Sequence, residues 1–297
     1  ATTEIYTLSL HDALPIWKVR PVEHLLAQAT ATPQYYKGVL YQGFSSLEES
    51  LAAGVNVTCC TFPGSIVAMD ASTGRVLWNR QTVPAGASGA AIWSTPTIDE
   101  QRGAVYVATG DNYSDPPTEL SDSVLALDLK SGDLLWAHQF TEGDAYNGGC
   151  SNVGRRNCPK ANGPDFDFGQ PPILFTFEGG KRALLIAQKS GMAYALDPDE
   201  DGKLLWQTRA GAGGLLGGSM WGSAVDAHHM YVAISDASVR TGLTGATLDP
   251  KKGGGLHALD VATGKIAWSA TLGKRDVASG DPMKFDSIFR IYSMTKP

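Results

Sequence analysis

The stretch that decides the fold is Ala68-Met69-Asp70-Ala71-Ser72-Thr73-Gly74-Arg75-Val76-Leu77-Trp78. Apolar residues alternate before Asp70, which is typical of a half-buried strand. An Asp with a Gly nearby indicates a hairpin turn, because the Asp side chain caps its own backbone and Gly tolerates a positive φ. Trp78 then closes a second strand with a large flat side chain. The stretch therefore predicts two antiparallel strands joined by a tight turn.

The same phrase, Ala-x-Asp with a Trp eight or nine residues after the Asp, occurs four times, over 68–78, 126–136, 195–206 and 258–268. Its Trp residues are 58, 70 and 62 residues apart, and Trp17 stands 61 residues before the first of them. A hairpin and an aromatic residue at a nearly constant period indicate the blades of a β-propeller. Four coincidental hairpins in a sandwich are the alternative. We expect an all-β, partial propeller of about four blades.

Composition and charge exclude several classes of protein. The 297 residues are 43% hydrophobic and 18% charged, which is typical of a globular chain. The net charge of −6 argues against non-specific binding of nucleic acid. No apolar run is long enough for a transmembrane segment. The N-terminus also lacks the basic and apolar regions of a signal peptide.

The four cysteines form two close pairs, Cys59-Cys60 and Cys150 with Cys158. They suggest two disulfides and an oxidising compartment, with free thiols in a cytosolic protein as the alternative. The Cys-x-x-Cys-His pattern of covalent haem attachment does not occur, and neither do paired Cys-x-x-Cys zinc motifs.

Both ends of the chain differ in character from the repeats. Residues 4–16, EIYTLSLHDALPI, resemble the translation of a sequencing adapter, and no Ala-x-Asp phrase precedes Trp17. We interpret 1–16 as an adapter-like artefact and 17–270 as the propeller. Residues 289–297 resemble the start of a serine hydrolase of the β-lactamase type, whose Ser-x-x-Lys matches Ser293 and Lys296. We interpret 271–297 as a foreign, inactive stub, with a genuine fusion as the alternative.

Between the phrases, alternating apolar residues predict further strands. We expect strands at 35–42, 104–110 and 230–236, a strand pair at 183–197, and loops at 43–50 and 141–170.

From Trp17 to Trp268 the sequence resembles the pyrroloquinoline quinone (PQQ)-dependent alcohol dehydrogenases, and in particular their polyvinyl-alcohol-dehydrogenase-like branch. The repeated phrase is similar to the motif that docks the blades of that family. The resemblance implies an eight-bladed periplasmic propeller with PQQ, and usually Ca²⁺, on its axis. Non-catalytic propellers carry the same phrase, so the loops must decide the function.

Two loops resemble those that hold the metal ion in this family. Gly43-x-Ser45-x-x-Glu48 is similar to the loop of the metal-binding Glu, with Glu49 as the alternative ligand and Ser45 near the PQQ carboxylates. Thr109-Gly110 matches the strand end that supplies an Asn ligand, and here Asp111 and Asn112 follow. Carboxylate and amide oxygens both suit Ca²⁺. A solvated acidic loop and a polar turn are the alternatives.

Other residues resemble the family's cofactor contacts. Cys59-Cys60 would form the vicinal disulfide ring known beside PQQ, although it is not in the position that methanol dehydrogenases use. Trp93 is similar to a Trp that stacks on the quinone. Lys189, before a strand ending in Asp, is similar to the cation that stabilises charge on the quinone oxygens. Trp221 resembles another residue that faces the cofactor.

Phe166-Asp167-Phe168 resembles a Trp-Asp-Phe segment whose Asp is the catalytic base, and Asp167 would also contact the metal. Asp165 and Asp144 are the alternative bases, and a loop of solvated acids is the other interpretation. The base would take the hydroxyl proton of an alcohol while hydride passes to PQQ. The resemblance does not decide between Ca²⁺ and a lanthanide.

The order of these motifs favours a periplasmic quinoprotein that oxidises a small or polymeric alcohol, such as polyvinyl alcohol or another secondary alcohol, and passes electrons to a cytochrome c. The alternative is a non-catalytic scaffold, as in outer-membrane assembly lipoproteins. A closed ring at about 60 residues per blade needs more chain than this. We therefore expect open sheet edges, poor folding and little activity from these residues alone.

Overall fold

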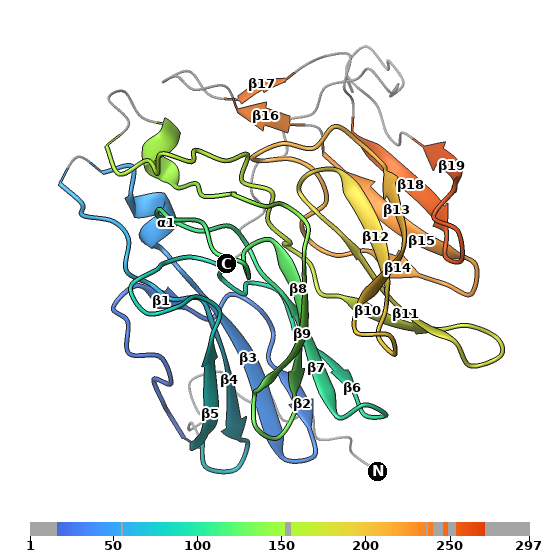
Figure 1. Cartoon of the computed structure of the whole chain (residues 1–297), viewed down its shortest axis with the longest axis horizontal. Helices are drawn as coiled ribbons and strands as arrows, with labels where there is room; N and C mark the ends of the chain where they lie inside the picture. The colour runs from blue at the N-terminus through green and yellow to red at the C-terminus, as the bar shows by residue number, and fades with distance from the viewer. Residues whose placement is uncertain are drawn as a thin grey trace, which may run out of the picture.

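The computed structural model describes residues 17–54, 56–151, 156–235, 237–239, 246–248 and 254–270. The predicted foreign segments at 1–16 and 271–297 lie outside these residues. The described part is almost entirely β-structure, in four sheets of antiparallel strands that follow one another along the chain (Figure 1). It contains no helix long and apolar enough to cross a membrane.

The first two sheets contain strands β1 to β9. The first has the order β1-β3-β4-β5, with β2 paired to β3, and the second has the order β6-β7-β8-β9. Their bounds are β1 Ala27–Gln28, β2 Gln34–Tyr36, β3 Val39–Ser46, β4 Ser65–Asp70, β5 Val76–Gln81, β6 Thr97–Asp99, β7 Ala104–Ala108, β8 Ser123–Asp128 and β9 Leu134–Gln139.

The third sheet has the order β10-β11-β12-β13, and the fourth β14-β15-β18-β19. A separate pair, β16 and β17, lies in the fourth repeat. The bounds are β10 Ile173–Thr176, β11 Arg182–Ala187, β12 Met192–Asp197, β13 Lys203–Arg209, β14 Ala224–Val225, β15 His229–Ile234, β16 Ala237–Val239, β17 Ala246–Leu248, β18 Gly255–Asp260 and β19 Ile266–Ala270.

The repeated phrase forms the last hairpin of each sheet. In the first sheet Ala68 pairs directly with Trp78, and the register shifts immediately after Ala68. The Asp70 carboxylate caps the turn by accepting hydrogen bonds from the backbone N–H groups of Ser72 at 3.1 Å and Thr73 at 2.9 Å. The same Ala–Trp pairing recurs in the other three sheets. The predicted hairpins are therefore confirmed.

The Trp of the first three phrases also docks one sheet on the next. The Trp78 indole N–H donates to the Leu129 carbonyl at 3.2 Å, and its ring covers the turn glycine Gly132, where a Cβ would lie 2.6 Å from the ring. Trp17, Trp136 and Trp206 cover Gly74, Gly202 and Gly264 in the same way. This repeated docking, with Trp17 as its first member, confirms the predicted propeller blades.

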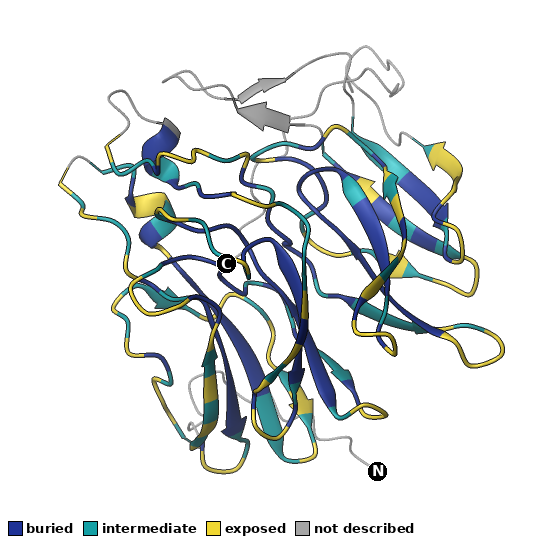
Figure 2. Ribbon diagram, viewed as in Figure 1, coloured by how far each residue is buried: buried dark blue, intermediate teal, exposed yellow. Residues whose placement is uncertain are grey.

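The hydrophobic core lies between successive sheets. Figure 2 shows the second and third strands of the first three blades as mostly buried and the outermost strands as partly exposed. One cluster joins β7 and β8 to β11 and β12 through Tyr106, Leu184 and Ile186, all fully buried. At the far end, Trp268 on β19 is 43% exposed, so the fourth sheet has no docked neighbour among the described residues.

Two segments differ from the sequence-based expectation. Residues 35–42 are not one strand, because Lys37 and Gly38 have φ values of 45° and 84° and form a turn between β2 and β3. Residues 43–50 are not a loop, since β3 continues to Ser46 and helix α1 spans Glu48–Leu51. The long loop at 141–170 is present and contains a 3-10 turn, η1, at Gly148–Ser151.

Candidate metal and cofactor site

The candidate site residues lie on the segments that connect strands at one end of the blades. Glu49, Asp111 and Lys189 each follow the second main strand of a blade, after β3, β7 and β11. Asp165 and Asp167 come from the loop that leads into the third blade. Backbone hydrogen bonds join these loops, among them Lys189 N–H to the Asp167 carbonyl at 3.0 Å. Equivalent positions in successive blades thus converge on one place.

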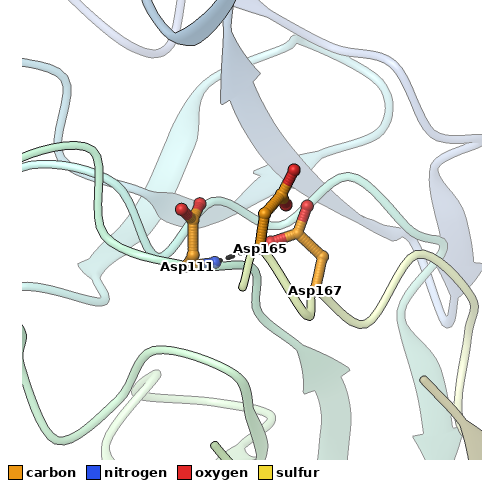
Figure 3. A group of neighbouring side chains, drawn as sticks. All are labelled: Asp111, Asp165 and Asp167. Carbon is orange, nitrogen blue, oxygen red and sulfur yellow. Dashed lines mark hydrogen bonds between the residues drawn. The ribbon is translucent and has the colours of Figure 1, made fainter. Parts of the chain in front are cut away.

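Three buried carboxylates meet there. One oxygen each of Asp111, Asp165 and Asp167 lies within 4.8 Å of those of the other two (Figure 3). The backbone N–H of Asp111 donates to Oδ1 of Asp167 at 2.7 Å. Gly110 leaves the room for this contact, because a Cβ at that residue would lie 2.5 Å from the same oxygen.

Lys189 is the cation of the cluster. Its Nζ donates to Oδ1 of Asp165 and, at 3.2 Å, to Oδ2 of Asp167, and its side chain is buried. Burial acts to lower the pKa of Lys189, but the charges of Asp165 and Asp167 raise it above the ordinary value. Lys189 therefore stays protonated at neutral pH.

The carboxylates outnumber this cation. Burial, followed by the charge of Asp167, raises the pKa of Asp111 well above its ordinary value. Burial likewise raises the pKa of Asp165, against the opposing effect of Lys189. Glu49, which is partly buried, has its pKa raised to about 7 by burial and by the charge of Asp167. The raised pKa values show that ionising these carboxyls together is costly here, and a bound cation would relieve that cost.

An orphaned oxygen supports the same conclusion. Oδ2 of Asp111 is buried and has no hydrogen-bond partner. A buried carboxylate oxygen without a donor is costly unless a cation contacts it. Several carboxylate oxygens at one point form the donor set that hard cations such as Ca²⁺ prefer. The residues present therefore fit a hard cation.

Asp144 orients the loop of Asp165. Its Oδ1 accepts from the backbone N–H of Asp165 at 3.2 Å, and its Oδ2 accepts from that of Phe166 at 2.9 Å. Gly163 allows the approach, since a Cβ there would lie 2.0 Å from Oδ1 of Asp144. Burial raises the pKa of Asp144 to about 6. Both oxygens of Asp144 thus face the backbone of the loop that carries Asp165 and Asp167.

Two predicted metal ligands have other partners in the structure. Both oxygens of Glu48 accept from the backbone N–H of Thr61, at 3.1 and 2.9 Å, and one also accepts from Phe62 N–H at 2.7 Å. Oδ1 of Asn112 accepts from Thr118 N–H at 2.6 Å, and its amide donates to the Ser88 carbonyl at 3.0 Å. Of each alternative pair, Asp111 belongs to the cluster, whereas Glu49 is linked to it through its pKa, on which Asp167 and Lys189 act.

The remaining predicted cofactor residues lie in two places. Ser45 lies at the end of β3, and its hydroxyl contacts the Gln28 carbonyl and the Thr30 hydroxyl, so it faces the first blade. Trp93 and Cys60 pack against one hydrophobic cluster around Phe62.

The aromatic residues define one wall beside the acids. A Cβ on Gly169 would lie 2.2 Å from the Trp93 ring, so that ring covers the backbone two residues after Asp167. Trp221 contacts Trp93 edge-on, with ring centroids 6.0 Å apart, and is 80% exposed.

Both predicted cysteine pairs are disulfides, Cys59–Cys60 and Cys150–Cys158. The first lies in the sequence between helix α1 and Thr61. The Glu48 carboxylate of α1 accepts hydrogen bonds from the backbone N–H groups of Thr61 and Phe62. Sequence reasoning did not identify the role of the second. Two asparagines lie near this disulfide in the sequence, Asn147 and Asn157. Their contact with each other becomes evident only in the folded chain.

Two family models match parts of the sequence. The β-propeller domain of glucose, ethanol and alcohol dehydrogenases, a PQQ domain, matches residues 84–150. The model of the outer membrane protein assembly factor BamB matches residues 189–283 and thus runs past the boundary expected at residue 270.

Two curated relatives are polyvinylalcohol dehydrogenases. The protein of a Pseudomonas species is 38% identical over 97% of this chain and 45% of its own length. That of Sphingopyxis sp. strain 113P3 is 38% identical over 90% of this chain and 42% of its own length. The chain therefore spans about half the length of the curated relatives it matches.

Solved structures share the fold. A quinohemoprotein alcohol dehydrogenase from Pseudomonas putida HK5 superposes with a TM-score of 0.60 at 17% identity, over 82% of this chain and 46% of that one. The quinohemoprotein alcohol dehydrogenase of Comamonas testosteroni gives a TM-score of 0.56 at 20% identity, over the same shares.

Proposed function

We propose that this chain, which belongs to the PQQ β-propeller family of alcohol dehydrogenases, provides the metal-binding and proton-accepting part of a quinoprotein that oxidises an alcohol. The observation that carries the proposal is the contact of buried Lys189 with Asp165 and Asp167, beside Asp111. Such a cluster has no structural purpose that a well-packed apolar core would not serve better. It is the kind of strained electrostatic arrangement that active sites contain.

A hard cation, Ca²⁺ in our proposal, would be held by Asp111, Asp167 and Glu49. Asp111 brings an oxygen with no other partner, and Asp167 is fixed beside it by the Asp111 N–H. Burial and, after it, the charge of Asp167 raise the pKa of Glu49 to about 7. When bound, PQQ would supply the acceptor for hydride from the carbinol carbon.

The chain itself would supply the base. Both oxygens of Asp167 already accept hydrogen bonds, from Asp111 N–H and from Lys189. For the carboxylate of Asp165 the described structure shows only the hydrogen bond from Lys189. We therefore assign Asp165 as the base that takes the hydroxyl proton of the substrate, and Asp167 as the ligand. Asp144 fixes the base by holding its backbone N–H.

Lys189 and Trp93 would orient the reacting groups. The Lys189 ammonium stays protonated, so it can neutralise negative charge that develops on an acceptor oxygen next to Asp165. The Trp93 ring, seated on Gly169, offers a flat apolar face beside the carboxylates that would bind a planar ring system and exclude water from one side.

The polyvinylalcohol dehydrogenases among the relatives support a secondary alcohol, small or polymeric, as the substrate. The two disulfides support the periplasm as the compartment. A cytochrome c is the acceptor that we propose for the electrons, in keeping with the resemblance that the loops carry.

The test is reconstitution of the purified chain with PQQ and Ca²⁺, read by absorption spectroscopy and by dye-linked oxidation of polyvinyl alcohol and a small secondary alcohol. We expect a bound quinone band that Lys189→Met removes. Lys203→Met is the matched control, because Lys203 lies in the same blade and is exposed.

The second candidate is a protein-interaction scaffold, which the BamB match over residues 189–283 favours. A folded chain that binds neither PQQ nor Ca²⁺ would support the scaffold and overturn the dehydrogenase.

A further inference from the structure

Part of the long loop between the second and third blades has contacts that the proposed mechanism does not use. Residues 147–150 and 157–158, joined by the Cys150–Cys158 disulfide, will be called the cystine clamp. They lie against α1, the helix that carries Glu49, and against the segment that follows Asp111.

Asn157 contacts the helix directly. Its side-chain amide donates to the carbonyl oxygens of Ala52 at 3.1 Å and Val57 at 2.8 Å, on the two sides of the turn that ends α1. Its backbone is in the left-handed region, with a φ of 69°. These two bonds span about a third of the sequence, so they fix α1 to a loop of a different blade.

Asn147 continues the connection to the metal group. Its buried amide donates at 2.8 Å to the Asn157 carbonyl and at 2.8 Å to the Tyr113 carbonyl. Tyr113 stands two residues after Asp111 and is itself buried. One asparagine amide therefore links the segment of Asp111 to the residue that holds the helix of Glu49.

Two glycines let the clamp approach so closely. A Cβ on Gly148 would lie 3.0 Å from the carbonyl oxygens of both Glu49 and Ser50. A Cβ on Gly149 would lie 2.8 Å from Oδ1 of Asn147, which accepts the Gly149 N–H. The clamp thus packs on the backbone of Glu49 itself.

We propose that the cystine clamp is a positioning device that sets the separation of Glu49 from Asp111, with Asn157 and Asn147 as positioning residues for cation binding. The inference rests on the proposed function, because it needs a cation at the carboxylates. The Cys150–Cys158 bond contributes by keeping Asn157 next to Asn147.

The test is the affinity of Tb³⁺, a luminescent probe of Ca²⁺ sites, together with the number of water molecules on the bound ion from lifetimes in H₂O and D₂O. The variant is Asn157→Gly, which tolerates the positive φ and adds no charge. Asn162→Gly is the matched control, because Asn162 is exposed, has a φ of 42°, and lies in the same loop.

We expect Asn157→Gly to weaken Tb³⁺ binding about tenfold or more, as for other residues that orient metal ligands, and to add water to the bound ion. Asn162→Gly should change neither value. In a Glu49→Gln background the effect of Asn157→Gly should disappear, because the two changes act through one ligand.

Equal Tb³⁺ affinity in the wild type and Asn157→Gly, or an undiminished effect in the Glu49→Gln background, would overturn the clamp. If Asn157→Gly does not fold, the double variant Cys150→Ala/Cys158→Ala replaces it, with the same expectations. If that variant also fails to fold, the clamp is a folding element and the proposal is rejected. A wild-type protein that binds no Tb³⁺ rejects the proposed function as well.

Discussion

The backbone N–H of Asp111 donates a 2.7 Å hydrogen bond to the carboxylate of Asp167, although the two residues belong to different blades. Asp111 follows β7 of the second blade, and Asp167 precedes β10 of the third. The geometry of the acidic cluster therefore depends on how these blades dock. Substitutions at the cluster should therefore change cation affinity, whereas substitutions in the ion pairs between blades should change the free energy of unfolding.

Gly110→Ala should weaken cation binding without unfolding the protein. A Cβ at residue 110 would lie 2.5 Å from Oδ1 of Asp167, so that carboxylate must move away from Asp111 N–H. We expect a loss of about tenfold or more in Ca²⁺ affinity. Calorimetric titration measures it, and far-UV circular dichroism in chelator checks the fold. An unchanged affinity would show that the position of Asp167 does not matter.

Arg182→Met should destabilise the pair of the second and third blades. Buried Arg182 on β11 donates to both oxygens of Asp99 on β6, each at 2.8 Å, and also pairs with Asp199. Removing the cation leaves the Asp99 carboxylate buried, with the Tyr106 hydroxyl as its one remaining side-chain donor in the described part of the chain. The free energy of unfolding should fall by about 3–5 kcal/mol in urea titrations.

Arg102→Met is the matched control for that change. Arg102 pairs with the same Asp199 at 3.3 Å, but its side chain is 33% exposed. An exposed pair contributes less than about 1 kcal/mol. Equal losses from the two arginines would contradict the importance of burial.

Asp122→Asn should stabilise the protein at neutral pH. Both carboxylate oxygens of Asp122 are buried without a hydrogen-bond partner, and burial raises its pKa well above the ordinary value. A raised pKa in the folded state costs stability as the pH rises above the unfolded-state value near 3.8. The variant should gain about 1–3 kcal/mol at pH 7 and nothing near pH 3. A gain in stability that does not depend on pH would show that the ionisation of Asp122 is not its cause.

The turn aspartates should give the opposite dependence on pH. Hydrogen bonds from the hydroxyls of Ser72 and Thr73 lower the pKa of Asp70 to about 2. Its stabilising effect is therefore complete above the unfolded-state value near 3.8 and is lost as the pH falls through about 2. The melting temperature of Asp70→Asn should lie below that of the wild type at pH 6, and the two should converge near pH 2. A constant difference would exclude the carboxylate as its source.

The repeated phrase made the blades predictable because each of its residues acts locally. Asp70 caps its own turn, and Trp78 reaches the equivalent turn of the next repeat one period later. The hairpin at Lys37-Gly38 was missed because Lys rarely adopts a positive φ, so the sequence offered only one turn residue there.

The sequence motifs predicted which residues belong to the site, but they did not predict which of these residues contact one another. The motifs located Asp111, Asp165, Asp167 and Lys189, which the fold brings together. They could not separate Glu48 from Glu49, because adjacent residues at the start of a short helix point in different directions. Glu48 turns to Thr61 and Phe62, a contact set by the chain around Cys59–Cys60. Asn147 and Asn157 belong to none of the motifs, so the sequence did not point to them.

The central claim is that Asp111 and Asp167, with Glu49, form one site for a hard cation. Calorimetric titration of the chelator-treated chain with Ca²⁺ tests it most directly, in the wild type, in Asp111→Asn and in the exposed control Asp133→Asn. We predict one ion bound per chain in the wild type and in Asp133→Asn, and loss of that binding in Asp111→Asn. Absence of binding in the folded wild type, or equal binding in all three proteins, would contradict the claim.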